Sequence, residues 1–154
     1  MKGEHEHEHA GTPPTTALLR RPEMLVKREV LTALREAGFV DVLPAHLGVF
    51  QYPGPNGQRP GMLAQRNQAS KQSMNHLLHQ LEEGGYLYRE PQPGDRRSRV
   101  VRLTERGWAA AEVIGKAMDT VENSWAAALG EGGYTALRGA LAQLDELIER
   151  GEAT

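Results

Sequence analysis

The sequence predicts a mainly α-helical fold with one small β-wing. Over most of the chain, apolar residues recur at intervals of three and four, which is the spacing of helices with one buried face. One stretch departs from this spacing, because two short runs with the composition of strands flank a segment rich in proline and arginine. We expect four parts: a disordered polar tail (1–15), an N-terminal helix (16–42), a central region (43–104) and C-terminal helices (105–150).

The composition is that of an ordinary soluble protein, with 39% hydrophobic and 25% charged residues. No apolar stretch approaches the roughly 20 residues that cross a bilayer, and the N-terminus has no apolar signal core. The absence of cysteine excludes disulfides and thiol-based sensing. We therefore expect a cytoplasmic protein with no membrane partner and no cofactor.

Charge is unevenly distributed along the chain. Residues 59–106 carry nine Lys/Arg against five Asp/Glu, a net charge of +4, whereas residues 107–154 carry three against eight, a net charge of −5. Attraction to phosphate needs only local positive charge, because screening limits its range to about 8 Å at physiological salt. The central region is therefore the candidate surface for nucleic acid, although most charge clusters are simply solvated faces.

Two helices precede the basic region. Pro22 suits a first helical turn and Gly38 a helix end, so we expect an amphipathic helix between them. A shorter helix is expected to begin near Pro44 and to end before the Pro/Gly/Asn-rich loop at 52–57. The apolar positions of these two helices are Val26, Val30, Ala33, Ala37, Leu47, Val49 and Phe50.

The basic region begins with a helix-turn-helix pattern. A short helix ending near Arg66 is followed by a turn at 67–69 and by Ser70, a favourable N-cap. The next helix buries one face through Met74, Leu77, Leu78 and Leu81. Its opposite face is polar and suits the major groove, where amides can pair with adenine and Lys or Ser can reach guanine edges or phosphates. The candidate DNA-binding residues on it are Ser70, Lys71, Gln72, Ser73, Asn75, His76 and His79.

A wing is expected after this helix. Strands at 86–89 and 99–103 flank an extended loop at 91–97 that ends in one carboxylate and two guanidiniums. We expect Asp95 to hold one arginine while the other, either Arg96 or Arg97, enters the minor groove. The alternative is an exposed salt-bridged loop.

The C-terminal third predicts two more helices. Each has a narrow apolar seam, and Gly130, Gly132 and Gly133 separate them. Such a pair has little partner surface of its own, so we expect it to form a two-fold homodimer with the same region and the first helix of a second copy. An antiparallel hairpin packed on the core of the same chain is the alternative. The seams are Ala111, Ile114, Met118, Val121, Trp125 and Ala128, then Tyr134, Leu137, Leu141, Leu144 and Ile148.

The order of these motifs resembles the MarR family of winged helix-turn-helix transcriptional regulators. The resemblance spans roughly Leu43 to Gly107 and is carried by Leu63-Ala64, the Ser70–Glu83 helix, Gly85, Asp95-Arg96-Arg97 and Leu103-Thr104. It implies a homodimer that binds a pseudo-palindromic operator in double-stranded DNA. It also implies a repressor that releases DNA when a small, often phenolic or anionic, effector binds between its subdomains.

The chain departs from the family pattern at two places. Asn67 and Gln68 stand where the family commonly has an apolar residue and a glycine, and we expect Asn67 to tolerate any left-handed conformation that the turn requires. His76 stands where the family often has an arginine, which would make affinity depend on pH if it faces a phosphate.

The effector pocket implied by the resemblance would lie where the first two helices meet the long helix. Its candidate residues are Phe39, His46, Phe50 and Tyr52, each of which is more often plain core.

Three other functions compete with DNA binding. His5, His7 and His9 alternate with glutamates and suggest a metal-responsive regulator, but a flexible tail offers no preorganised geometry, so no metal site is expected. No nucleophile and base with recognisable spacing and no phosphate-binding loop is present, so an enzyme is not expected and no catalytic residue is assigned. A winged-helix adaptor that binds protein stays open, and salt-dependent duplex binding would distinguish it.

Overall fold

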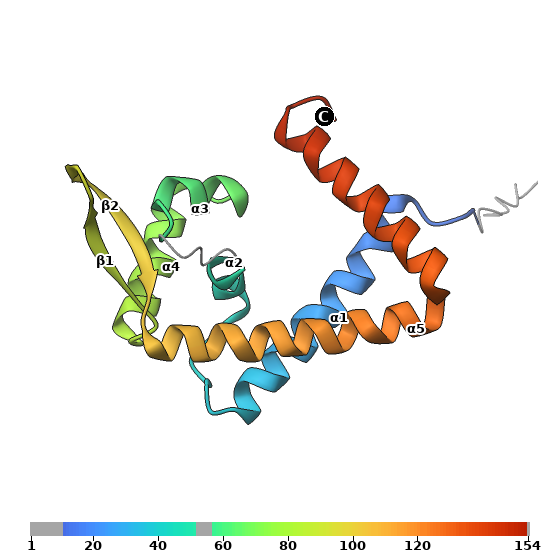
Figure 1. The fold of residues 1–154 in the computed structure, drawn as a ribbon, viewed down its shortest axis with the longest axis horizontal. Coiled ribbons are helices and arrows are strands. Elements are labelled where there is room, and N and C mark those ends of the chain that lie inside the picture. Colours follow the sequence, from blue (N-terminus) through green and yellow to red (C-terminus); the bar gives the residue numbers. More distant parts are fainter. Residues whose placement is uncertain (1–10, 52–56, 154) are drawn as a thin grey trace, which may run out of the picture.

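The computed structural model describes residues 11–51 and 57–153, and it shows a helical chain with a two-stranded hairpin at one end (Figure 1). This arrangement confirms the predicted fold, with a helix-turn-helix followed by a β-wing. No helix of the described residues is apolar over a stretch long enough to span a membrane. The elements are α1 (Thr15–Glu36), the 3-10 helix η1 (Pro44–His46), α2 (Leu47–Phe50), α3 (Pro60–Arg66), α4 (Lys71–Glu83), β1 (Leu87–Gln92), β2 (Asp95–Leu103) and α5 (Glu105–Glu149).

The first helix begins earlier than Pro22, and that prediction was wrong. α1 begins at Thr15, after Pro14 at the N-cap, and contains Pro22 in its interior. An interior proline leaves the carbonyl four residues earlier, that of Leu18, without its helical hydrogen bond. Residues 15–24 are exposed, so water can satisfy this carbonyl and the helix tolerates the proline.

One hydrophobic core connects the helices to the wing. α1 crosses α5 before its bend, and the winged helix-turn-helix lies toward the N-terminal end of α5 (Figure 1). The winged helix-turn-helix and the long helix therefore share one hydrophobic core. Its most buried members are Val30, Leu34, Leu63, Met74, Leu78, Leu81, Tyr86, Leu87 and Ala110.

The turn of the helix-turn-helix has its left-handed residue at Gln68, not at Asn67. Asn67 has φ −90°, and its side-chain amide donates to the Leu63 carbonyl at 2.8 Å, which closes the end of α3. Gln68 has φ +49° and is the only non-glycine residue with positive φ among the described residues. The left-handed conformation that Asn67 was expected to tolerate is thus taken by its neighbour, while the Asn67 side chain finishes the helix.

Replacing Gln68 by glycine is expected to stabilise the protein. A left-handed conformation costs a residue with a Cβ about 1–2 kcal/mol, and glycine avoids this at some cost in chain entropy. We expect the free energy of unfolding to rise by roughly 0.5 kcal/mol in urea denaturation. Gln65→Gly, in the regular part of α3, is the matched control and should lower it by about 1 kcal/mol; equal losses for both variants would contradict the prediction.

The wing is a tighter hairpin than the predicted strands and loop. The antiparallel strands pair Leu87 with Leu103 and Pro91 with Arg99, so they run on through most of the segment expected to be a loop. Pro91 is tolerated because a strand in a two-stranded sheet has a free edge. Gln58 also pairs with Val101 as an isolated bridge, which no sequence pattern indicated.

Gly130 divides α5 into two limbs, as the glycine pattern predicted. Its φ of +74° and ψ of 161° interrupt the helix, and the chain changes direction sharply there (Figure 1). The limb that follows does not pack on the core of its own chain. Its apolar seam stays exposed at Leu137, Leu141, Leu144 and Ile148, so the intrachain alternative is not what the structure shows.

Candidate nucleic-acid interface

The second helix of the helix-turn-helix, α4, which we call the recognition helix, turns one face to the core and the other to solvent. Met74, Leu78 and Leu81 are almost completely buried, so the helix cannot rotate about its axis. The Ser70 Oγ accepts the Ser73 backbone N–H at 3.0 Å and caps the helix, as predicted. All seven candidate residues lie exposed on the outer side: Ser70, Lys71, Gln72, Ser73, Asn75, His76 and His79.

Arg96 and Arg97 are exposed and lie near the start of β2, directly after Asp95. Asp95 does not hold either guanidinium, contrary to expectation. One of its carboxylate oxygens accepts the Arg97 backbone N–H at 2.9 Å and the other accepts the Ser98 hydroxyl at 2.7 Å. Both hydrogen bonds lower the pKa of Asp95, and the one from Ser98 has the larger effect. The carboxylate therefore shapes the backbone of the turn and leaves both arginine side chains facing solvent.

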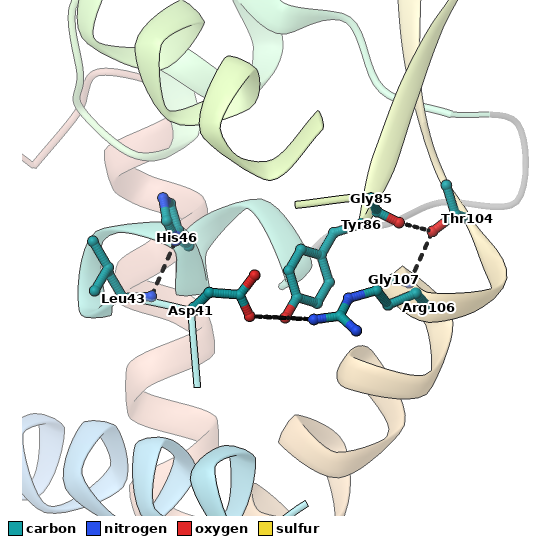
Figure 2. A network of polar contacts seen from close by, with 8 residues as sticks. All are labelled: Asp41, Leu43, His46, Gly85, Tyr86, Thr104, Arg106 and Gly107. Carbon is teal, nitrogen blue, oxygen red and sulfur yellow. Dashed lines mark hydrogen bonds and ion pairs between the residues drawn. The ribbon is translucent and has the colours of Figure 1, made fainter. Parts of the chain in front are cut away.

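A polar network joins the winged helix-turn-helix to α5 (Figure 2). The buried Tyr86 donates its hydroxyl hydrogen bond to Asp41, and Arg106 lies 2.9 Å from the same hydroxyl and 3.3 Å from Asp41. The Arg106 guanidinium also stacks 4.5 Å from the centroid of the Tyr86 ring and 5.6 Å from that of Phe39. The network connects the segment after α1, the start of β1 and the start of α5, and so orients the wing on the long helix.

Replacing Tyr86 by phenylalanine should make the free energy of unfolding less dependent on pH in the acidic range. The Tyr86 hydroxyl is the largest cause that lowers the pKa of Asp41 below its usual value. A lowered pKa stabilises the fold above the unfolded pKa, and this contribution is lost as pH falls through the folded pKa. We expect Tyr86→Phe to cost about 1 kcal/mol at pH 7, and its difference from the wild type to shrink towards pH 3 in urea denaturation. A pH-independent difference would contradict this coupling.

A second junction lies beside this network. Thr104 donates to the Gly85 carbonyl and accepts the Gly107 backbone N–H at 3.1 Å, so it caps α5 and fixes it to the end of α4 (Figure 2). Nearby, the buried His46 accepts the Leu43 N–H at Nδ1, which leaves Nε2–H to donate to the Gln80 side chain at 2.9 Å. His46 thereby ties η1 to the recognition helix.

The predicted effector-pocket residues lie in or against the core. Phe50 and His46 are almost completely buried, and Phe39 and Phe50 pack their rings on Tyr86. Tyr52 lies outside the described residues. Elsewhere, a surface hollow of about 520 Å³ lies between the limbs of α5 and another of about 240 Å³ lies beside α4. The assignment of Phe39, His46, Phe50 and Tyr52 to an effector pocket stays a prediction.

The His/Glu repeat that suggested metal binding also lies outside the described residues. Within the described part of the chain, no three His, Cys, Asp or Glu side chains gather in a way that could hold a metal ion.

Three residues that shape this interface could not be identified from the sequence. Arg89 of β1 contacts Asn75 on α4, and Arg106 meets Asp41 from 65 positions away. Such pairs leave no periodic signal, because they depend on how the hairpin folds back on the helices. Tyr86 was expected only as a strand residue, and its almost complete burial became apparent only in the structure.

Comparison with known proteins agrees with this geometry. Residues 41–98 match the family model described as MarR family, and a search of the curated proteins found no match. The chain is similar to a transcriptional regulator from Thermotoga maritima, with 27% identity over 92% of this chain and 98% of that one and a TM-score of 0.57. It is also similar to the transcriptional repressor CouR, solved with a 23-mer DNA duplex, with 25% identity over 86% of this chain and 92% of that one and a TM-score of 0.69.

A third similar structure is a MarR family protein from Mycobacterium tuberculosis in complex with salicylic acid. The identity is 24%, over 88% of this chain and 98% of that one, and the TM-score is 0.63. MarR family proteins are transcription regulators and not enzymes. The match to the MarR family model covers the helix-turn-helix and most of the wing, and the likeness to solved transcriptional regulators extends over nearly the whole chain.

Proposed function

We propose that the protein is a ligand-responsive repressor that binds a pseudo-palindromic operator as a homodimer. The observation that carries this proposal is the pairing of an exposed polar face on α4 with exposed arginines at the tip of the wing. A helix of this kind fits the major groove, and an arginine on a thin hairpin fits the narrower minor groove beside it. The similar repressor CouR was solved bound to a 23-mer DNA duplex, which supports binding to double-stranded DNA.

The homodimer is supported by apolar surface that the described chain leaves uncovered. Leu18, Leu19 and Met24 on α1 are 38–57% exposed, and the C-terminal limb of α5 adds a long exposed seam. The hollow of about 520 Å³ between the limbs of α5 includes Trp125, Tyr134 and Leu141 in its lining. Large contiguous apolar patches are uncommon on monomers, and a second copy of the same helices would cover this one symmetrically.

An anionic aromatic effector is the third element of the proposal. Its support is the similar Mycobacterium tuberculosis protein, which was solved with salicylic acid. The candidate contacts remain Phe39, His46, Phe50 and Tyr52. Salicylate is therefore the first probe, and it should weaken duplex binding if the effector class is right.

Salt-dependent duplex binding tests the DNA-binding role. Affinity should fall linearly with salt on logarithmic axes, because arginines that bind phosphates release counterions from DNA. We expect the double variant Arg96→Gln/Arg97→Gln to reduce that slope by about one for each phosphate that is no longer neutralised. Arg28→Gln/Arg35→Gln on α1 removes the same charge away from the interface and is the control. An unchanged slope in the wing variant, or no slope in the wild type, would favour a protein-binding adaptor instead.

A further inference from the structure

Arg89 of β1 lies along the recognition helix and holds one of its exposed side chains. Its Nη1 donates to the Asn75 Oδ1 at 3.2 Å, and its Nη2 lies 3.4 Å from the Asn75 carbonyl. Its Nε lies 3.6 Å from the Glu82 carboxylate, about two turns further along α4. Only 24% of the Arg89 side chain is exposed, and although its buried Nε makes no hydrogen bond, the two Nη contacts and the ion pair with Glu82 hold the guanidinium against Asn75.

This contact decides which end of the Asn75 amide can reach DNA. A guanidinium carries only donors, so the amide must present its oxygen to Arg89. The NH2 group is then the part of the amide directed away from β1. The Asn75 amide is therefore held with its donor group outward, whereas a free asparagine can turn either end toward a base.

A second donor lies one helical turn away. Lys71 and Asn75 line the same hollow of about 240 Å³, which Pro60 and Gly61 at the start of α3 also line. An ammonium has three donors and no acceptor. The polar side chains of this hollow therefore offer donors to whatever enters it.

We propose that Asn75 and Lys71 read a guanine in each half-site and that Arg89 is the positioning residue that sets this preference. Guanine presents two acceptors, N7 and O6, in the major groove, whereas adenine presents one acceptor and one donor. Pairing with adenine would bring its N6–H2 donor against the Lys71 ammonium and against an Asn75 oxygen that already accepts from Arg89, whereas guanine brings only acceptors to these donors. The inference rests on the proposed DNA-binding function and adds the base that this part of the helix selects.

The test is selection of bound duplexes from a random pool with the full-length protein and its variants. The wild type should enrich an inverted repeat that contains one specific guanine in each half-site. Asn75→Ala should no longer select a guanine at that position. In Arg89→Met, the amide is free to turn, so the preference at that same position should shift towards adenine. The affinity of Arg89→Met for the wild-type site should fall about tenfold. Arg99→Met removes an exposed arginine of the adjacent strand and should keep the guanine.

Asn75→Asp provides a second route to the same answer, because Asn75 is exposed and this change does not touch the core. It replaces the donor by an acceptor, so the guanine should be lost even if Arg89→Met proves unstable. An inverted repeat whose guanine survives in Arg89→Met or in Asn75→Asp overturns this inference alone. Equal weakening of every sequence by Arg89→Met, with a reduced salt slope, also overturns it, since Arg89 would then bind phosphate. No enriched duplex for the wild type overturns the proposed function itself, and this inference with it.

Discussion

Leu141→Glu is expected to leave the purified protein monomeric and to lower its affinity for operator DNA about a hundredfold. The residue lies in the middle of the exposed seam on the C-terminal limb of α5, where it is 40% exposed and lines the hollow between the two limbs. In the proposed dimer a second copy covers this seam. A carboxylate there would be buried without a partner, at a cost that a small helical interface cannot offset.

The loss of DNA affinity follows from the loss of the second helix-turn-helix. Two linked helix-turn-helix units bind two half-sites with an effective concentration that a monomer does not have. Sedimentation velocity measures the oligomeric state, and fluorescence anisotropy of a labelled operator measures the affinity. Circular dichroism should show unchanged helix content, because the seam makes no contact with the core of its own chain.

Gln143→Glu is the matched control for this variant. It places a new carboxylate on the same limb, two residues away and therefore about 160° from Leu141 around the helix axis. It should remain dimeric and bind DNA as the wild type does. If Leu141→Glu remained dimeric, the dimer interface would have to lie elsewhere on the protein. If both substitutions disrupted the dimer equally, the added negative charge, and not burial of the apolar seam, would be the cause.

The local parts of this fold could be predicted from the sequence. Ser70 is an N-cap, Met74, Leu78 and Leu81 form the buried face of α4, and Gly130 breaks the long helix, as their spacing indicated. Each of these features depends on neighbours within one or two turns. Such features are decided by backbone hydrogen bonding and helical periodicity, which a single sequence displays.

The errors arose where a local signal competes with solvent or with tertiary contacts. Pro22 is typical of a helix start, but exposure lets the helix continue through it. Asp95 was expected to pair with a neighbouring arginine, yet the turn brings the Arg97 N–H and the Ser98 hydroxyl to its carboxylate first. The residue type thus indicated a local feature in both cases. Solvent exposure at Pro22, and nearer hydrogen-bond donors at Asp95, decided the actual structure.

The contacts that position the candidate site were beyond sequence reasoning for a different reason. Asp41 and Arg106 are far apart in the chain, and nothing in either segment indicates that Tyr86 brings them together. The same holds for Arg89, which reaches Asn75 only because the hairpin packs beside α4. The exposed polar side chains of α4 could therefore be named from the sequence, while the side chains that contact them from other elements needed the structure.

Gly107→Ala is expected to be the most damaging of the small substitutions. A Cβ at this position would lie 2.0 Å from the Tyr86 carbonyl oxygen and 3.1 Å from the Leu103 Cβ. The first contact is with backbone, which cannot turn aside as a flexible side chain would. Relief requires the start of α5 to move away from the wing, and that motion would strain the Thr104 cap and the Thr104–Gly85 bond.

We expect this substitution to lower the free energy of unfolding by about 3 kcal/mol, at the upper end of what overpacking usually costs. Urea denaturation followed by circular dichroism measures it. Gly115→Ala, two turns further along α5, is the matched control, because a Cβ there meets nothing within 4 Å. That variant should be more stable by roughly 0.5–1 kcal/mol, since alanine is the better helix former. If both alanine variants were as stable as the wild type, the close approach of α5 to the wing could not be what fixes their relative orientation.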